Sequence, residues 1–110
     1  MTPAAAFAKI TQQLDVNENV VTWSAARLRK QDARGRAAES LAGAAALTRE
    51  RVLFAGSAGD DESFLSIPLD SVASVGLRTT RRDRFTVIAL ERGPEHHLDL
   101  PTSFYAALTP

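Results

Sequence analysis

The stretch Ala44–Phe54, AAALTRERVLF, decides how the rest of the chain is interpreted. Two apolar runs, Ala44–Leu47 and Val52–Ala55, flank the polar tetrapeptide Thr48–Arg51. Short apolar runs separated by a few charged residues are typical of two antiparallel strands that meet at a turn. We therefore expect a β-hairpin at this place.

The residues that lead into this hairpin support two interpretations. Residues 37–47, AAESLAGAAAL, are rich in alanine, whose intrinsic propensity favours a helix. Gly43 in the middle of the run and the β-prone residues 52–54 after it favour a strand. On these residues alone the helix and the strand are equally supported.

The N-terminal residues predict a helix. Thr2-Pro3 is a typical helix start, because threonine caps free amides and proline suits the first helical position. Phe7, Ile10 and Leu14 then recur at spacings of three and four. Such spacing places them on one face of a helix over residues 3–14, and this apolar face must pack against something else.

A short C-terminal helix is expected over residues 102–109, capped by Thr102 or Ser103. Its apolar face would carry Phe104, Ala107 and Leu108.

Between the two helices, alternating or β-rich runs predict the remaining strands. They are Val20–Leu28, Phe64–Leu69, Ser74–Thr79, Phe85–Leu90 and His96–Leu100. Residues 29–39 and Gly56–Ser63 are expected to be loops. Seven short strands at hairpin spacing favour a closed or nearly closed antiparallel barrel or sandwich over residues 19–100. The fold class is therefore mainly β, with terminal helices that cover its open ends.

Size and composition indicate one globular domain, residues 1–110. Thirteen basic and thirteen acidic residues give a formal net charge of zero, and 6% of the residues are aromatic, so nucleic-acid binding has little support. The chain has no cysteine, which excludes disulfides and thiolate chemistry. Neither a secretory signal nor a membrane-spanning stretch is recognisable, and we expect a soluble, cytoplasmic protein.

Several patches resemble the bacterial pleckstrin-homology-like domains, relatives of the GRAM domains. Residues 46–54, ALTRERVLF, resemble the family's Leu-Thr-x-x-Arg pattern across strands two and three. Residues 66–75, SIPLDSVASV, resemble its Ile-Pro-Leu segment, and residues 17–20, NENV, are similar to the start of its first strand. The resemblance implies a barrel of about seven strands and a strand, not a helix, before Thr48.

The resemblance also implies a candidate ligand site. In pleckstrin-homology domains, the loop between strands one and two binds phosphoinositide headgroups through a lysine and a basic-x-basic triplet. Lys30, followed by Arg34-Gly35-Arg36, has this form. Guanidinium groups grip phosphate oxygens in pairs, so Lys30, Arg34 and Arg36 are candidate ligands for an anionic lipid or small molecule. A solvated basic loop is the simpler reading of the same residues.

The sequence offers no catalytic or cofactor motif. His96 and His97 are adjacent on an expected strand, so they point to opposite faces and cannot ligate one metal ion together. The acidic run at residues 60–62 lacks the spacing of a calcium loop. We expect no metal, no cofactor and no enzymatic activity; a small hydrolase is the most distant alternative.

The leading functional hypothesis is a non-enzymatic interaction domain that acts on a protein partner or on a second copy of itself. Its motivation is the pair of amphipathic terminal helices, whose apolar faces exceed what one small barrel needs for cover. The candidate interface residues are Phe7, Ile10, Leu14, Phe104 and Leu108. Binding of an anionic ligand or membrane surface through the basic loop is the alternative.

Overall fold

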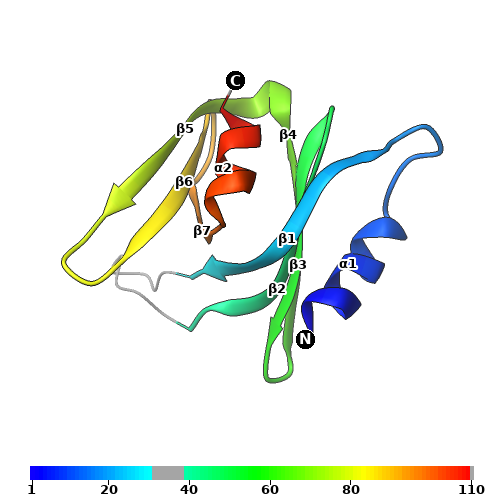
Figure 1. Ribbon diagram of the computed structural model, residues 1–110, viewed down its shortest axis with the longest axis horizontal. Coiled ribbons are helices and arrows are strands. Elements are labelled where there is room, and N and C mark those ends of the chain that lie inside the picture. The colour runs from blue at the N-terminus through cyan, green and yellow to red at the C-terminus, as the bar shows by residue number, and fades with distance from the viewer. Residues whose placement is uncertain (31–38, 110) are drawn as a thin grey trace.

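In a computed structural model, which describes residues 1–30 and 39–109, seven antiparallel strands form one sheet with a helix at each end of the chain (Figure 1). The spatial order is β4-β3-β2-β1-β7-β6-β5. The strands are β1 (Val20–Arg29), β2 (Leu41–Thr48), β3 (Arg51–Ala58), β4 (Asp61–Pro68), β5 (Val72–Thr79), β6 (Arg84–Leu90) and β7 (His96–Asp99). The helices are α1 (Pro3–Thr11), the single 3-10 turn η1 (Leu69–Ser71) and α2 (Thr102–Leu108).

The sheet bends over itself into a sandwich and does not close. Strand β1 pairs with β2 along most of its length but with β7 only through Arg27, Leu28 and Arg29, so the bend lies along β1. Strands β4 and β5 are the two edges, and no pairing joins them in the described part of the chain. The expected strand number, antiparallel arrangement and terminal helices are confirmed, and of the expected barrel or sandwich the structure is the open sandwich.

The hairpin at residues 44–54 is confirmed, because β2 and β3 pair in register from Ala42↔Ser57 to Leu47↔Val52. The alanine-rich residues before it are a strand, as the resemblance implied. Strand β2 is buried on both faces: Ala45 packs in the interior of the sandwich and Ala44 packs under α1. A strand that is buried between two layers packs closely when its side chains are small. This tertiary packing outweighs alanine's intrinsic preference for helix.

At Gly43 the backbone of β2 lies close to that of β3. A Cβ atom at this position would be 1.9 Å from the carbonyl oxygen of Ala55 and 2.6 Å from the Cα atom of Gly56. Only glycine allows the two backbones to approach so closely. The glycine that argued against a helix is therefore a packing requirement of the hairpin.

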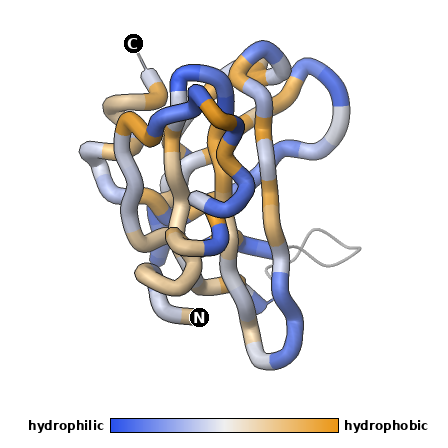
Figure 2. Tube along the Cα trace, turned by 90° about the vertical axis from the view of Figure 1, so that its right-hand side faces the viewer, coloured by the Kyte–Doolittle hydropathy of each residue, from blue (hydrophilic) through white to orange (hydrophobic). Residues whose placement is uncertain are grey.

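Two apolar cores lie on the two sides of the β2–β3 hairpin. The inner core contains Phe54, Ile88 and the α2 residue Phe104. The outer core is smaller and joins Ile10 of α1 to Leu53 of β3. Figure 1 shows α2 between the two halves of the sandwich and α1 on the other side of the sheet. In Figure 2, hydrophobic stretches run through the middle of the strands and hydrophilic ones gather at the turns.

One of the expected loops is wrong. Residues 56–63 continue the two strands, and Ala58 pairs with Asp61 across a two-residue turn at Gly59 and Asp60. Gly59 has a φ angle of 59°, in the left-handed region that suits a tight hairpin turn. The polar composition of this segment reflects solvent exposure of a protruding hairpin.

The helix ends also differ in detail from the expectation. The hydroxyl of Thr2 caps α1 by accepting a hydrogen bond of 3.1 Å from the Ala5 amide, as expected. However, α1 ends at Thr11, three residues before the expected end. Helix α2 begins after Pro101 and has no side-chain cap, so the expected cap at Thr102 or Ser103 is wrong.

Candidate functional site

The predicted basic loop lies largely outside the described residues. Arg34 and Arg36 belong to the segment 31–38, which the structure does not describe. Lys30 follows the last residue of β1, and its ammonium group lies 2.9 Å from the carboxylate of Asp61, at the β3–β4 turn. The anion site thus stays a prediction, and its lysine is engaged in an exposed ion pair.

The predicted interface residues fall into two groups. Ile10 is fully buried against the sheet and Phe104 is 1% exposed inside the sandwich, so both stabilise this chain and offer no surface to a partner. We had expected both residues to lie on apolar faces that a partner could contact, but both pack inside the domain itself. Phe7, Leu14 and Leu108 are only partly buried and remain accessible.

The most distinctive accessible group is an aromatic pair on the outer face of β1. The ring of Trp23 stacks on Phe7 of α1, with centroids 4.2 Å apart and planes 10° from parallel. Trp23 is nevertheless 42% exposed, and Val21, two residues earlier on the strand, is 59% exposed. The stacking on Phe7 fixes the Trp23 ring in place at the surface.

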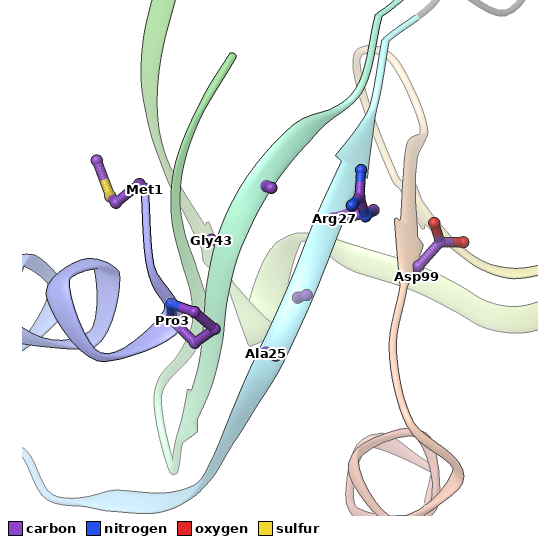
Figure 3. A pocket seen from close by; sticks show the side chains of 8 residues that line it. Met1, Pro3, Ala25, Arg27, Gly43 and Asp99 are labelled. Atoms are coloured by element: carbon purple, nitrogen blue, oxygen red, sulfur yellow. The ribbon is translucent and has the colours of Figure 1, made fainter. Parts of the chain in front are cut away.

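A hollow of about 470 Å³ continues this surface along β1 (Figure 3). Its floor consists of the small residues Ala25, Ala42 and Gly43. Met1 and Pro3 lie on one side of the floor, and Arg27 and Asp99 lie on the other. The outer face of β1, from Trp23 to this hollow, is called the β1 groove below.

The alternation of β1 explains why these residues share a face. Trp23, Ala25 and Arg27 are exposed, whereas Ala26 and Leu28 are buried in the inner core. Successive side chains of a strand point to opposite faces, so the exposed row is a continuous strip. Helix α1 covers β2 and β3 and leaves this strip open at its side.

A buried polar cluster at the β2–β3 turn was not foreseen from the sequence. The Arg51 guanidinium donates two hydrogen bonds to the carboxylate of Glu18, at 2.7 and 2.9 Å, and Thr48 donates a third at 2.8 Å. The Thr48 hydroxyl also accepts the amides of Glu50 and Arg51. The hydrogen bonds from Arg51 lower the pKa of Glu18 from 4.5 to about 2, although burial opposes the shift.

This cluster joins residues from the three patches on which the sequence resemblance rests. Glu18 comes from NENV, Thr48 and Arg51 come from ALTRERVLF, and Ser66, from SIPLDSVASV, accepts a hydrogen bond from Arg51 at 3.1 Å. The charged groups satisfy one another, so the cluster closes this end of the domain. Its role is structural.

A second polar cluster lies at the opposite end of β1. Arg29 contacts Asp99 at 2.7 Å and Asp83 at 3.0 Å, and its guanidinium lies 4.5 Å from the centre of the Phe85 ring. The hydrogen bond from Arg29 lowers the pKa of Asp83. These contacts hold β1, β7 and the β5–β6 turn together.

The described residues contain one group of three acidic side chains close enough to share an ion, formed by Asp15, Glu18 and Glu50. Glu18 already accepts hydrogen bonds from Arg51 and Thr48. In this group the charge of Glu18 is therefore balanced by the protein, and the group gives no basis for a metal site.

Within the described residues, no helix is long and apolar enough to cross a bilayer.

Comparison with known proteins supports the fold. No protein-family profile and no curated protein matches the chain in sequence. Among solved structures, the chain is similar to the Vps36 N-terminal PH domain, with a TM-score of 0.62 and 16% sequence identity, over 86% of this chain and 79% of that one. This chain therefore has a pleckstrin-homology-like fold, whereas membership of the bacterial GRAM-like group stays a prediction.

Proposed function

We propose that this chain is a non-enzymatic interaction domain whose contact surface for a protein, either a partner or a second copy, is the β1 groove. The observation that carries the proposal is the partly exposed Trp23, held rigid by Phe7. Tryptophan is enriched among residues that dominate binding energy, and a ring fixed beforehand loses little entropy on binding.

The surroundings of Trp23 support the same surface. The small floor residues Ala25 and Gly43 allow a partner's backbone or side chain to approach closely. Arg27 places a positive charge at its rim, while the neighbouring Asp99 is paired with Arg29, so the rim favours an orientation that brings an acidic group of the partner to Arg27. A formal net charge of zero removes the long-range repulsion that would keep two copies apart.

The test is a matched pair of variants. Trp23→Ser removes the aromatic ring from the groove, and Phe64→Ser removes a ring of similar exposure, 44%, from the outer face of β4 outside the groove. Sedimentation velocity at several concentrations measures self-association, and thermal unfolding verifies that both variants fold. We expect Trp23→Ser to weaken association by about tenfold or more and Phe64→Ser to leave it unchanged.

Two results would contradict the proposal. One is a wild-type chain that stays monomeric at all concentrations and co-purifies with the same proteins as the Trp23→Ser variant. The other is association that depends equally on Phe64 and Trp23, which would indicate non-specific apolar contact.

A further inference from the structure

A second hollow, of about 660 Å³, opens at the end of the sandwich where α2 finishes. Nine aliphatic residues line it, among them Leu47 of β2, Val75 of β5, Ile88 of β6 and Leu108 of α2. None of its lining residues is aromatic. The volume lies in the range of ligand pockets, and the lining suits a flexible aliphatic chain better than a flat ring.

The fold explains why this end stays open. Helix α2 has only seven residues, and its last turn reaches the rim of the hollow with Ala107 and Leu108. On the opposite rim, the register of β1 with β2 shifts between Val20 and Thr22, so Val21 is an extra residue that lines the hollow. This hollow, called the α2-end cavity, lies at the start of β1, away from the predicted basic loop at its far end.

The polar groups of the α2-end cavity leave one charge available. Thr48 lines the cavity, but its hydroxyl is committed to Glu18 and to two amides of the turn. Arg49 is the other polar lining residue, is exposed, and forms no ion pair with any described residue. Glu50, its acidic neighbour in the chain, does not line the cavity.

We infer that the α2-end cavity binds an aliphatic carboxylate, with the chain against Val75, Ile88 and Leu108 and the carboxylate on Arg49. Contact with the aliphatic walls removes apolar surface from water on both sides. A guanidinium without a partner, placed at the mouth of an apolar pocket, selects a carboxylate by paired, charge-assisted hydrogen bonds. The inference goes beyond the proposed function, because it concerns another surface and a small ligand.

The experiment titrates decanoate, below its micellar concentration, into the full chain and follows methyl signals by NMR. We expect saturable shifts confined to methyl groups of the cavity, such as those of Val75, Ile88 and Leu108. Decanol serves as the uncharged probe and should bind about tenfold more weakly. Absence of saturable shifts with decanoate, or shifts spread over the whole surface, would overturn the inference.

Two neighbouring alanines of α2 provide a matched pair of variants. Ala107 lines the cavity and Ala106 does not, although both are exposed on the same helix. Ala107→Trp should fill the mouth and abolish decanoate binding, whereas Ala106→Trp should preserve it. Because neither side chain is buried, both variants are expected to fold. Equal binding by the two variants would place the decanoate elsewhere and overturn the inference.

The charge requirement is tested at Arg49. Arg49→Gln should weaken decanoate binding about tenfold and leave decanol binding unchanged. If decanoate binds equally well to the wild type and this variant, the carboxylate assignment is wrong. A last outcome concerns self-association. If decanoate does not bind, and the wild type self-associates while the Ala107→Trp variant is monomeric, then a second copy of the chain occupies the cavity. That result would also overturn the inference.

Discussion

Arg51 and Arg29 are equally exposed arginines with different partners, and comparing them shows what decides how much an ion pair contributes to the stability of the fold. Both arginine side chains are 20% exposed, and each binds carboxylates from distant parts of the chain. The Glu18 side chain that Arg51 holds is 1% exposed, whereas the Asp83 and Asp99 side chains that Arg29 holds are 53% and 34% exposed. Burial of the acid, not of the arginine, distinguishes the two clusters.

The largest expected effect comes from removing the cation of the buried cluster. Arg51→Met should lower the free energy of unfolding by about 3–5 kcal/mol, because it leaves the Glu18 carboxylate enclosed without its counter-charge. Urea unfolding followed by circular dichroism measures the loss. A Glu18→Gln/Arg51→Met double variant is the control and should recover part of it. If Arg51→Met lost as little unfolding free energy as Arg29→Met, burial of the carboxylate would not be what decides the contribution of the ion pair.

The pH dependence should follow the same cluster. Glu18 titrates near 4.5 when unfolded and at about 2 when folded. The unfolded state thus binds more protons in this range, so the stabilisation is complete above pH 4.5 and is lost as the pH falls toward 2. We expect about 2–3 kcal/mol of unfolding free energy to disappear over this window.

Urea unfolding between about pH 6 and about pH 3 measures this slope. The Glu18→Gln variant should be less stable at neutral pH and show a flatter profile. An unchanged slope in that variant would assign the acid sensitivity to other carboxylates.

Thr48 tests whether the hydroxyl at the centre of the buried cluster matters apart from charge. Thr48→Val keeps the shape but removes the donor to Glu18 and the acceptor for the Glu50 and Arg51 amides. The expected loss of unfolding free energy is about 1–2 kcal/mol, because these groups lose a partner in a confined turn. Thr48→Ser should restore most of it in the same urea assay.

The smallest effect is expected in the exposed cluster. Arg29→Met should cost about 1 kcal/mol or less, because pairs with exposed carboxylates contribute little and the contact with Phe85 is modest. Measured again in 1 M NaCl, where the Debye length falls to about 3 Å, the cost should shrink further. The cost of Arg51→Met should stay nearly the same. A salt-insensitive Arg29 would contradict the comparison.

Much of the fold could be predicted from local sequence because its signals are short-range. The hairpin around Thr48–Arg51, the cap at Thr2 and the strand at residues 85–90 each depend on a few adjacent residues. The tight turn at Gly59-Asp60 was missed although its signal was present, since a glycine followed by aspartate between two strands is typical of a two-residue hairpin. The residues on both sides of this turn are mostly small or polar, so the whole segment 56–63 resembled a loop.

The candidate sites could be predicted less well. Phe7 and Ile10 were correctly placed on one apolar face of α1, and Leu14 packs on the same outer core from beyond the helix end at Thr11, but spacing cannot reveal whether a sheet or a partner covers such a face. Ile10 is buried by the sheet, whereas Phe7 stacks on the partly exposed Trp23 of β1. The α2-end cavity has no sequence signature, because its walls come from five strands, η1 and α2.

By itself, the sequence determined the approximate positions of most strands and of the terminal helices, the net charge of zero and the absence of thiol chemistry, since these depend on residue identity and neighbours in the chain. Tertiary structure decided that residues 41–47 are a strand, that Glu18 meets Arg51 and that Trp23 stays at the surface. The physical reason is that local preferences are weak, and burial between layers, or removal of a charge from water, involves larger free energies. Those free energies depend on residues that meet only after the chain has folded.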